Sequence, residues 1–144
     1  MKIRKGTYHD APFIKLLMEG LGYKTSNSLL ITQLTDLFSS SHHEVLVCEE
    51  REEVTGFAVV HVLPQLAFDG SLLIISYLTV DEQAKEQQTA RALENYITDL
   101  ARKRKCERIQ VHCAGWRAQA QRFFLGQGYD LYPQYFTKRL MYGE

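Results

Sequence analysis

The sequence lacks an excess of charge of either sign. Lysine plus arginine equals aspartate plus glutamate at 17 each, so the formal net charge of the 144 residues is zero. Proteins that bind nucleic acid or anionic membranes through their overall field carry a basic excess. The only local basic run, Arg102–Lys105, falls at an expected helix end, where cations complement the helix dipole. The composition therefore favours neither nucleic acid nor a membrane as a partner.

Cysteine is scarce and long apolar runs are missing. The three cysteines form no C-x-x-C spacing and leave an odd count, which argues against a disulfide framework and for a reducing compartment. The longest apolar run, Leu72–Ile75, is far shorter than a membrane span, and the first ten residues contain no apolar core of a signal peptide. We therefore expect a cytoplasmic protein with no membrane anchor.

Linkers, repeats and low-complexity tracts are also missing, so no domain boundary has a candidate. A hydrophobic fraction of 45% with 11% aromatic residues is typical of a folded globular chain rather than a disordered one. A chain of this length buries about 68–70% of its unfolded surface on folding. We expect a single domain over residues 1–144.

The spacing of apolar residues predicts alternating strands and helices. A first strand at Lys2–Lys5 precedes a helix that Thr7 and Asp10 open, and a serine-capped second helix follows. Later elements are a hairpin (44–50 with 54–63), a buried strand (71–80), a long helix through Ala90 and Leu93, a strand (107–113), a short helix (117–128), a final strand (135–140) and an optional short strand at 129–132. The order predicts an α/β (α+β) fold, with a mixed, mostly antiparallel sheet of six to seven strands and helices on both faces.

Four segments, residues 3–23, 45–60, 77–111 and 118–140, resemble the GNAT superfamily of acyl-CoA N-acyltransferases. The resemblance implies that acetyl-CoA or another acyl-CoA binds between the fourth and fifth strands. It also implies that the acyl group passes to a primary amine, on a small molecule or peptide, by direct attack in a ternary complex. The alternative is a non-catalytic GNAT-like module that has lost CoA binding and acts as a binding or assembly protein.

The crossing before the long helix carries the resemblance to the pyrophosphate site. In the family its backbone N–H groups and the helix N-terminus hold the phosphates, and an anion is favoured there on physical grounds alone. Lys85 keeps the cationic position and Ala90 the small one, whereas Glu86 and Gln88 replace glycines. The hydroxyl of Thr89 can donate to a phosphate. The implied cofactor-binding residues are Leu78, Thr79, Val80, Lys85, Glu86, Gln87, Gln88, Thr89, Ala90 and Phe124.

Catalytic side chains of the family are replaced in this chain. Ser76 or Tyr77 stands where many members place a carboxylate base, and Phe124 takes the position of a tyrosine acid. His112 is a candidate base, although a histidine at a strand end is more often structural. Backbone N–H groups at Leu78 and Val80 are expected to stabilise the oxyanion and contact the thioester, because they do not depend on side chains.

The acceptor is expected to lie against Tyr23, Phe68, Tyr77 and Trp116. Tyr77 is a candidate acid or substrate wall, although core packing is the commoner role for such a residue, and a lone tryptophan is more often a packing anchor. His42 and His43 have no third metal ligand at a suitable spacing, so no metal is expected. A homodimer is expected from the resemblance and from the general frequency of symmetric dimers.

Overall fold

The computed structural model describes residues 1–81, 86–112, 118–132 and 135–141. The chain divides into two compact units, residues 1–112 and residues 113–144, and each is described by itself. No helix of the described ranges is long and apolar enough to cross a membrane. The elements relevant to the site belong to the first unit.

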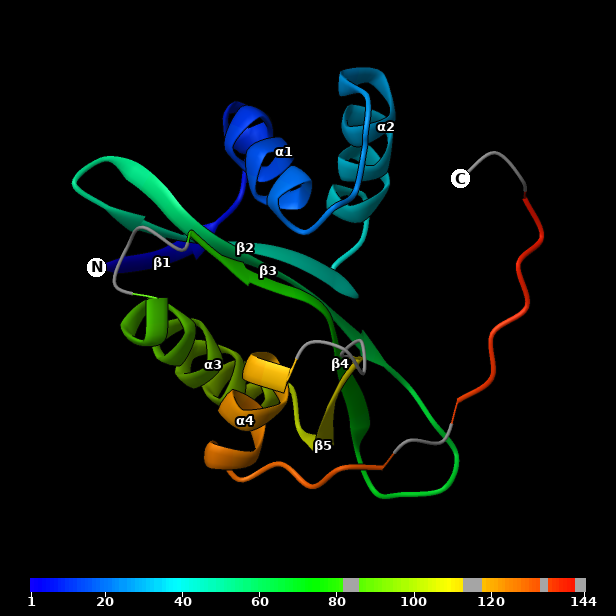
Figure 1. Ribbon diagram of the computed structural model, residues 1–144. Coiled ribbons are helices and arrows are strands. Elements are labelled where there is room, and N and C mark those ends of the chain that lie inside the picture. Colours follow the sequence, from blue (N-terminus) through cyan, green and yellow to red (C-terminus); the bar gives the residue numbers. More distant parts are fainter. Residues whose placement is uncertain (82–85, 113–117, 133–134, 142–144) are drawn as a thin grey trace. The chain divides into compact units, whose positions relative to one another are not determined.

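The first unit is built on a five-stranded sheet whose strands lie in chain order (Figure 1). The strands are β1 (Lys2–Lys5), β2 (His43–Glu50), β3 (Glu53–Leu63), β4 (Ser71–Val80) and β5 (Cys106–Val111). Neighbours pair antiparallel from β1 to β4, and β4 pairs with β5 in parallel. Because parallel neighbours need a crossover, helix α3 (Glu86–Lys103) connects β4 to β5.

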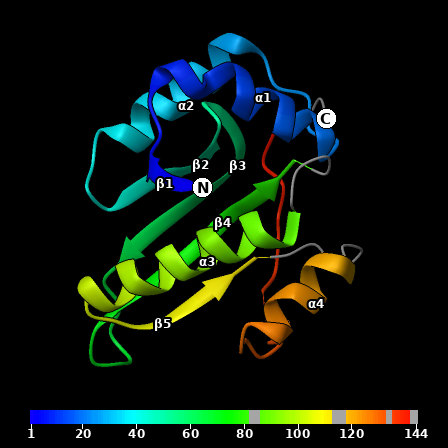
Figure 2. The same cartoon turned by 90° about the vertical axis from the view of Figure 1, so that its left-hand side faces the viewer.

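Helices cover both faces of this sheet. Helices α1 (Ala11–Gly20) and α2 (Asn27–Phe38) lie on one face, and α3 lies on the other (Figures 1 and 2). The short 3-10 helix η1 (Tyr8–Asp10) leads into α1. On the α1/α2 face, Ile14 and Leu34 pack against alternate residues of β2 and β3, including Val47, Phe57 and Val59. The period-two alternation of β2 and β3 therefore divides their side chains between two cores.

The opposite core lies beneath α3. Leu93 and Ile97 of α3 are fully buried, as are the central residues Leu73 and Ile75 of β4. Strand β4 has the bounds expected from the sequence, 71–80, because its apolar run contains no residue that stops a strand. The hairpin and the first two helices also agree with the sequence, and the hydroxyl of Ser26 caps α2 by accepting from the N–H of Leu29 at 3.1 Å.

The second unit contains helix α4 (Ala118–Gly126), which ends in a turn with Gly128 at φ 96°. The N–H of Tyr129 donates to the carbonyl of Phe124 and so closes the end of the helix. The positive φ of Gly128, which glycine adopts without strain, makes this bond possible. The final strand expected at 135–140 and the optional strand at 129–132 are wrong. None of residues 129–132 or 135–141 is in a strand, and Phe136 and Leu140 are exposed. Strand propensity is realised only where a second strand pairs, so a pattern of strand-forming residues alone does not make a strand.

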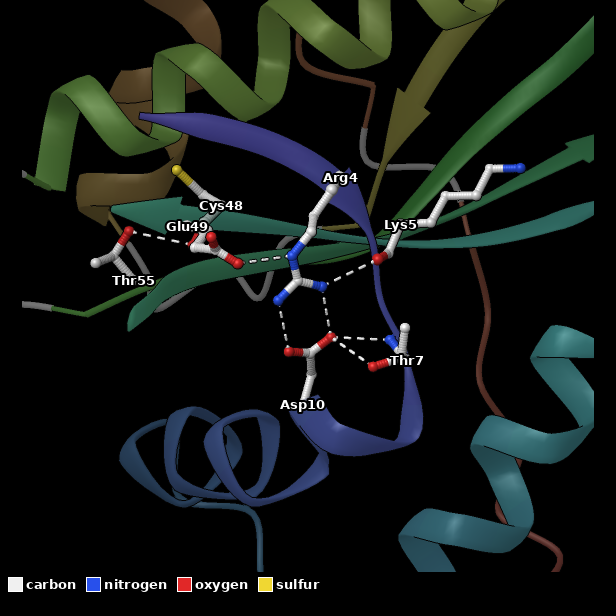
Figure 3. Close-up of polar contacts among 7 residues, drawn as sticks. All are labelled: Arg4, Lys5, Thr7, Asp10, Cys48, Glu49 and Thr55. Atoms are coloured by element: carbon white, nitrogen blue, oxygen red, sulfur yellow. Dashed lines mark hydrogen bonds and ion pairs between the residues drawn. The ribbon is translucent and has the colours of Figure 1, made fainter. Parts of the chain in front are cut away.

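The guanidinium of Arg4 ties β1 to the start of α1 and to β2 (Figure 3). Its Nη1 and Nη2 donate to the two carboxylate oxygens of Asp10 at 2.8 and 2.9 Å, and its Nε donates to Glu49 at 2.8 Å. Asp10 also accepts from the N–H of Thr7 at 2.8 Å. The Asp10 side chain is 4% exposed, whereas those of Arg4 and Glu49 are 27% and 28% exposed. Asp10 is therefore the buried centre of this cluster.

The pKa of Asp10 lies below its usual range, chiefly because Arg4 donates to the charged carboxylate, with the N–H of Thr7 adding to the effect and burial opposing it. A carboxylate with a lowered folded-state pKa stabilises the fold above its unfolded pKa, and the stabilisation is lost as the pH falls through the folded value. The contribution of Asp10 is therefore present at neutral pH.

Asp10→Asn is expected to lower the free energy of unfolding by about 2 kcal/mol at neutral pH, since a charge-assisted pair is replaced by a neutral one. The difference from the wild type should begin to shrink below a pH of about 4, where the carboxyl of the unfolded chain becomes protonated, and it should be lost below the lower folded-state pKa. Urea unfolding at several pH values measures both effects. The control is Glu49→Gln, a more exposed partner of Arg4, expected to cost less than about 1 kcal/mol. Equal losses in the two variants, or a pH-independent loss in Asp10→Asn, would contradict this assignment.

Candidate functional site

The central strand β4 runs past the end of its pairing with β5. The two strands pair from Ser71 to Ile75 on β4, opposite Cys106 to Val111 on β5. The N–H of His112, directly after β5, still donates to the carbonyl of Ile75 at 3.3 Å. From Ser76 to Val80, β4 continues to pair with β3 but, within the described sheet, does not pair with β5. The part of β4 that follows Ile75 therefore has an open edge within the first unit's described sheet.

A β-bulge lies where this edge opens. Val59 of β3 pairs with Tyr77, and the next residue, Val60, pairs with Ile75, so Ser76 is the extra residue on β4. A bulge changes the face to which the following side chains point. Tyr77 accordingly lies with Phe57 on the α1/α2 face, their ring centroids 6.5 Å apart. Ser76 points to the same face, where it contacts His61.

Backbone groups of the open edge have a defined direction. The N–H of Asp81 donates to Thr55 of β3 at 2.8 Å, so the backbone of Asp81 faces β3. Successive residues of a strand direct their N–H and C=O groups to opposite sides. The backbone groups of Leu78 and Val80 therefore face away from β3, toward the open edge, as their expected role with a thioester requires. The side chain of Thr79 is buried, and this residue pairs with Phe57.

Three polar side chains form a hydrogen-bonded chain across β2, β3 and β4, here called the Ser–His–His chain. The Nδ1 atoms of His43 and His61 are 2.8 Å apart, and the Nε2 of His61 is 2.9 Å from the Oγ of Ser76. Ser76 Oγ also lies 3.3 Å from the carbonyl oxygen of Val59. All three side chains are half-buried. The pKa of His61 is lowered by burial and by the neighbouring His43, so the neutral ring is favoured.

The structure brings two of the expected acceptor residues together. The rings of Tyr23 and Tyr77 meet edge to face with centroids 6.4 Å apart, and both side chains are partly exposed. The pKa of Tyr77 is raised, first by burial and then by Tyr23, so its hydroxyl stays protonated. Ser76, Tyr77 and the backbone of His112 thus lie at one point of β4, where its pairing with β5 ends.

The first turn of α3 packs tightly on the sheet. Thr89 is fully buried, and its hydroxyl has no hydrogen-bond partner among the residues that the structure describes. A Cβ placed on Gly56 of β3 would lie 2.9 Å from the methyl of Thr89 and 3.0 Å from the carbonyl of Thr79, so only glycine fits there. Gln87 and Gln88 are exposed and Ala90 is buried. The first N–H groups of a helix lack intrahelical acceptors, so this turn can hold an anion.

Several expected site residues lie elsewhere or outside the described ranges. Lys85 and Trp116 lie outside the described residues, as does the side chain of Glu86. Phe68 lies in the loop before β4, with the guanidinium of Arg108 3.5 Å from its ring centroid. Tyr77 is seven residues along β4 from the end of that loop, about 23 Å at strand rise, so Phe68 is not beside it. In the second unit, Phe124 is buried between Phe123 and Tyr129.

The two histidines considered as metal ligands have other partners. His42 Nδ1 bonds to the carbonyl of Val62 at 3.1 Å, and His43 contacts His61. Across residues 1–81, 86–112, 118–132 and 135–141, no three His, Cys, Asp or Glu side chains gather as a metal site would need. His61 was not identified from the sequence, because a lone histidine in an apolar strand gives no functional signal.

A match to a protein-family model identifies the family that has this architecture. The model of the acetyltransferase (GNAT) family matches residues 13–129, which include β4, β5 and α3. The chain belongs to the GNAT acetyltransferase family. A comparison with curated protein sequences gives no match.

Solved structures have the same fold. A transcriptional regulator from Bacillus halodurans C-125 aligns with a TM-score of 0.87 at 18% identity, over 96% of this chain and 99% of that one. A putative acetyltransferase from Agrobacterium tumefaciens aligns at 0.86 and 13% identity, over 97% and 100%. Glucosamine-6-phosphate N-acetyltransferase from Arabidopsis thaliana aligns at 0.82 and 17% identity, over 97% and 98%. Sequence identities this low show that these proteins share the fold of this chain, and no more than the fold.

Thr89→Val is expected to raise the free energy of unfolding by about 1 kcal/mol. It replaces a buried hydroxyl, to which the described residues give no hydrogen-bond partner, by a methyl of similar shape. The matched control on the same helix is Thr98→Val, which removes a 2.7 Å bond to Glu94 and should lower stability by a similar amount. Chemical denaturation measures both changes.

The same variant tests the expected contact of Thr89 with a phosphate. Since the side chain is buried against the sheet, we expect the affinity for acetyl-CoA to change less than about threefold in Thr89→Val. A larger loss of affinity, without a loss of stability, would show that the hydroxyl reaches the ligand.

Proposed function

We propose that this protein transfers an acetyl group from acetyl-CoA to a primary amine by direct attack in a ternary complex. The observation that carries the proposal is the open edge of β4 beyond Ile75, with the backbone of Leu78 and Val80 directed outward. An edge of this kind pairs with an extended, amide-bearing arm as it would with another strand. Membership of the GNAT acetyltransferase family supports the same choice of co-substrate.

The described residues suit acetyl-CoA at two places. The open edge of β4 offers N–H and C=O groups to the amide-bearing arm, and the first turn of α3 offers N–H groups to its phosphates. Acetyl-CoA supplies the activated thioester. The N–H groups of Leu78 and Val80 face the open edge and would stabilise the oxyanion, since donors that are fixed in advance stabilise such charge without reorganisation. The positions of Lys85, Gln87 and Gln88 remain part of the proposed phosphate site.

The amine would approach on the α1/α2 face, where Tyr23 and Tyr77 form an aromatic wall. Holding the amine against the thioester supplies several kcal/mol of the barrier as effective molarity. The raised pKa of Tyr77 keeps its hydroxyl protonated, so this wall can offer a proton donor. A small-molecule or peptide amine as acceptor, a homodimer and a cytoplasmic location belong to the same proposal.

The second candidate is a binding module of the same family without catalysis. It is favoured by Phe124, which is buried among aromatic rings and has no hydroxyl to donate to a leaving thiolate. It is also favoured by Ser76, where many family members have a carboxylate. The two candidates differ in whether CoA is released when an amine is present.

Acetyl-CoA at about 100 times its dissociation constant should stabilise the protein by about 2.7 kcal/mol and raise the melting midpoint by about 9 °C. Thermal unfolding with acetyl-CoA measures this, with free CoA and ADP as controls for the phosphate part of the site. A thiol assay with a panel of primary amines then measures CoA release. No shift at millimolar acetyl-CoA contradicts the proposal and favours the binding module, which has lost CoA binding; a shift without CoA release from any amine contradicts both candidates as stated.

A further inference from the structure

The Ser–His–His chain begins at the proposed point of transfer. Ser76 is the bulged residue of β4 directly after Ile75, where pairing with β5 ends, and it precedes the open edge at Leu78 and Val80. Its hydroxyl points to the α1/α2 face, the same face as the aromatic wall of Tyr23 and Tyr77. An amine that attacks a thioester lying on the open edge would arrive beside this hydroxyl.

The other end of the chain reaches the surface. His43 lines an open depression of about 370 Å³ with Lys5, Glu44 and Arg104 among its other lining residues. Arg104 is paired with Glu44 at 3.5 Å and donates to the carbonyl of Ser41. The half-buried His61 thus lies between a hydroxyl at the proposed acyl site and a histidine in contact with solvent.

We propose that Ser76, His61 and His43 form a proton relay that accepts the proton of the attacking amine and releases it to solvent at the depression beside Arg104. The inference rests on the proposed transferase function and assigns its general base. Ser76 is the group that touches the substrate, and the two histidines act through it.

The proton transfers balance without another reactant. As the amine nitrogen bonds to the thioester carbon, one N–H proton passes to Ser76 Oγ and the serine proton passes to His61 Nε2. The Nδ1 proton of His61 then passes to His43 Nδ1, and the resulting imidazolium loses its Nε2 proton to water. The C–S bond breaks when the tetrahedral intermediate collapses, and the CoA thiolate takes a proton from solvent. His43 releases one proton to water and the CoA thiolate takes one up, so no net charge accumulates on the protein or the products.

The hydrogen bonds permit the relay in both of its states. Before the proton transfer, Ser76 donates to His61 Nε2, and His61 Nδ1–H donates to His43. After the transfer, His43 donates to His61, His61 Nε2–H donates to Ser76, and Ser76 donates to the carbonyl of Val59. Each polar atom between the ends keeps a partner in both states. The lowered pKa of His61, from burial and from His43, keeps its ring neutral and able to accept a proton near neutral pH.

The charged and titratable groups around the relay are few. His61 on β3 faces His43 on β2 and Ser76 on β4, and Tyr77 lies next to Ser76 with a raised pKa that keeps it neutral. At the surface end are the Arg104–Glu44 pair and Lys5. None of these places a fixed carboxylate in contact with His61.

The test compares two isosteric substitutions with a neighbouring control. In His61→Gln the side-chain amide can replace the Nε2 contact to Ser76, and in His43→Asn it can replace the Nδ1 contact to His61, but neither amide carries a proton onward. The control is His42→Asn, an exposed neighbour whose Nδ1 contacts the carbonyl of Val62 rather than a member of the chain. The measurement is kcat/KM for CoA release across roughly pH 5 to 9, with far-UV circular dichroism to verify folding.

We expect the wild-type rate to fall at low pH with a midpoint below the ordinary histidine value of about 6.5. Both relay variants should lose about 100-fold in kcat/KM and lose that acid limb, while the thermal shift with acetyl-CoA persists. His42→Asn should retain the wild-type kcat/KM and its fall at low pH. If folded His61→Gln kept the wild-type kcat/KM and the same fall at low pH, the relay would be wrong. The proposed transferase function would be unaffected by that result. A wild type that binds acetyl-CoA but releases CoA with no amine would overturn the transferase, and the relay's catalytic role with it.

A second measurement does not depend on the variants folding. In ¹⁵N NMR of histidine rings of the free wild-type protein, His61 should titrate below about 6.5, and both ring nitrogens should show hydrogen-bonded shifts. Titration of His61 at the ordinary value, with the tautomer ratio of a free imidazole, would overturn the relay.

Discussion

The site depends on the unequal pairing of β4 with its two neighbours. Strand β3 pairs with β4 along its whole length, whereas β5 pairs with it only as far as Ile75. Backbone N–H and C=O groups need partners when they are removed from water. The edge from Ser76 to Val80 is therefore suited to an extended ligand, and its rigidity comes from β3 and from the cores on both faces. A site on a central strand is held more precisely than one carried only by loops.

Two bulges place the polar groups beside this edge. On β4 the extra residue Ser76 turns Tyr77 onto the α1/α2 face. On the β2–β3 hairpin the register shifts between Cys48 and Glu49, so that His43 lies opposite His61. Each bulge interrupts a ladder and is tolerated where the surrounding structure compensates. Here the compensation includes the hydrogen bonds of the Ser–His–His chain, which give half-buried polar atoms partners.

These bulges also mark the limit of what the sequence predicts. Counting outward from the pair Glu49 and Val54, an unbroken hairpin would set His43 opposite Val60, so periodicity alone directs His61 to the wrong face. Strong periodic segments such as 71–80 and the α3 region were predicted because burial on a face fixes their pattern. The strand expected at 135–140 was wrong because pairing is non-local. Of the expected site, Ser76, Tyr77 and Tyr23 are brought together, while Phe68 lies near Arg108 at the far end of β4.

The replacement of a carboxylate by Ser76 changes the electrostatics of the proposed site. A carboxylate at this point would hold a fixed negative charge beside an edge where an oxyanion and then a thiolate develop, and like charges in a half-buried site repel strongly. In the proposed relay His61 starts as a neutral ring, because burial and His43 lower its pKa, and the chain gains positive charge only as it takes up a proton. Its charge therefore appears together with the negative charge that it offsets. The family's usual tyrosine acid is also missing at Phe124, so a site that avoids standing negative charge lowers the demand for protonation of the leaving thiolate.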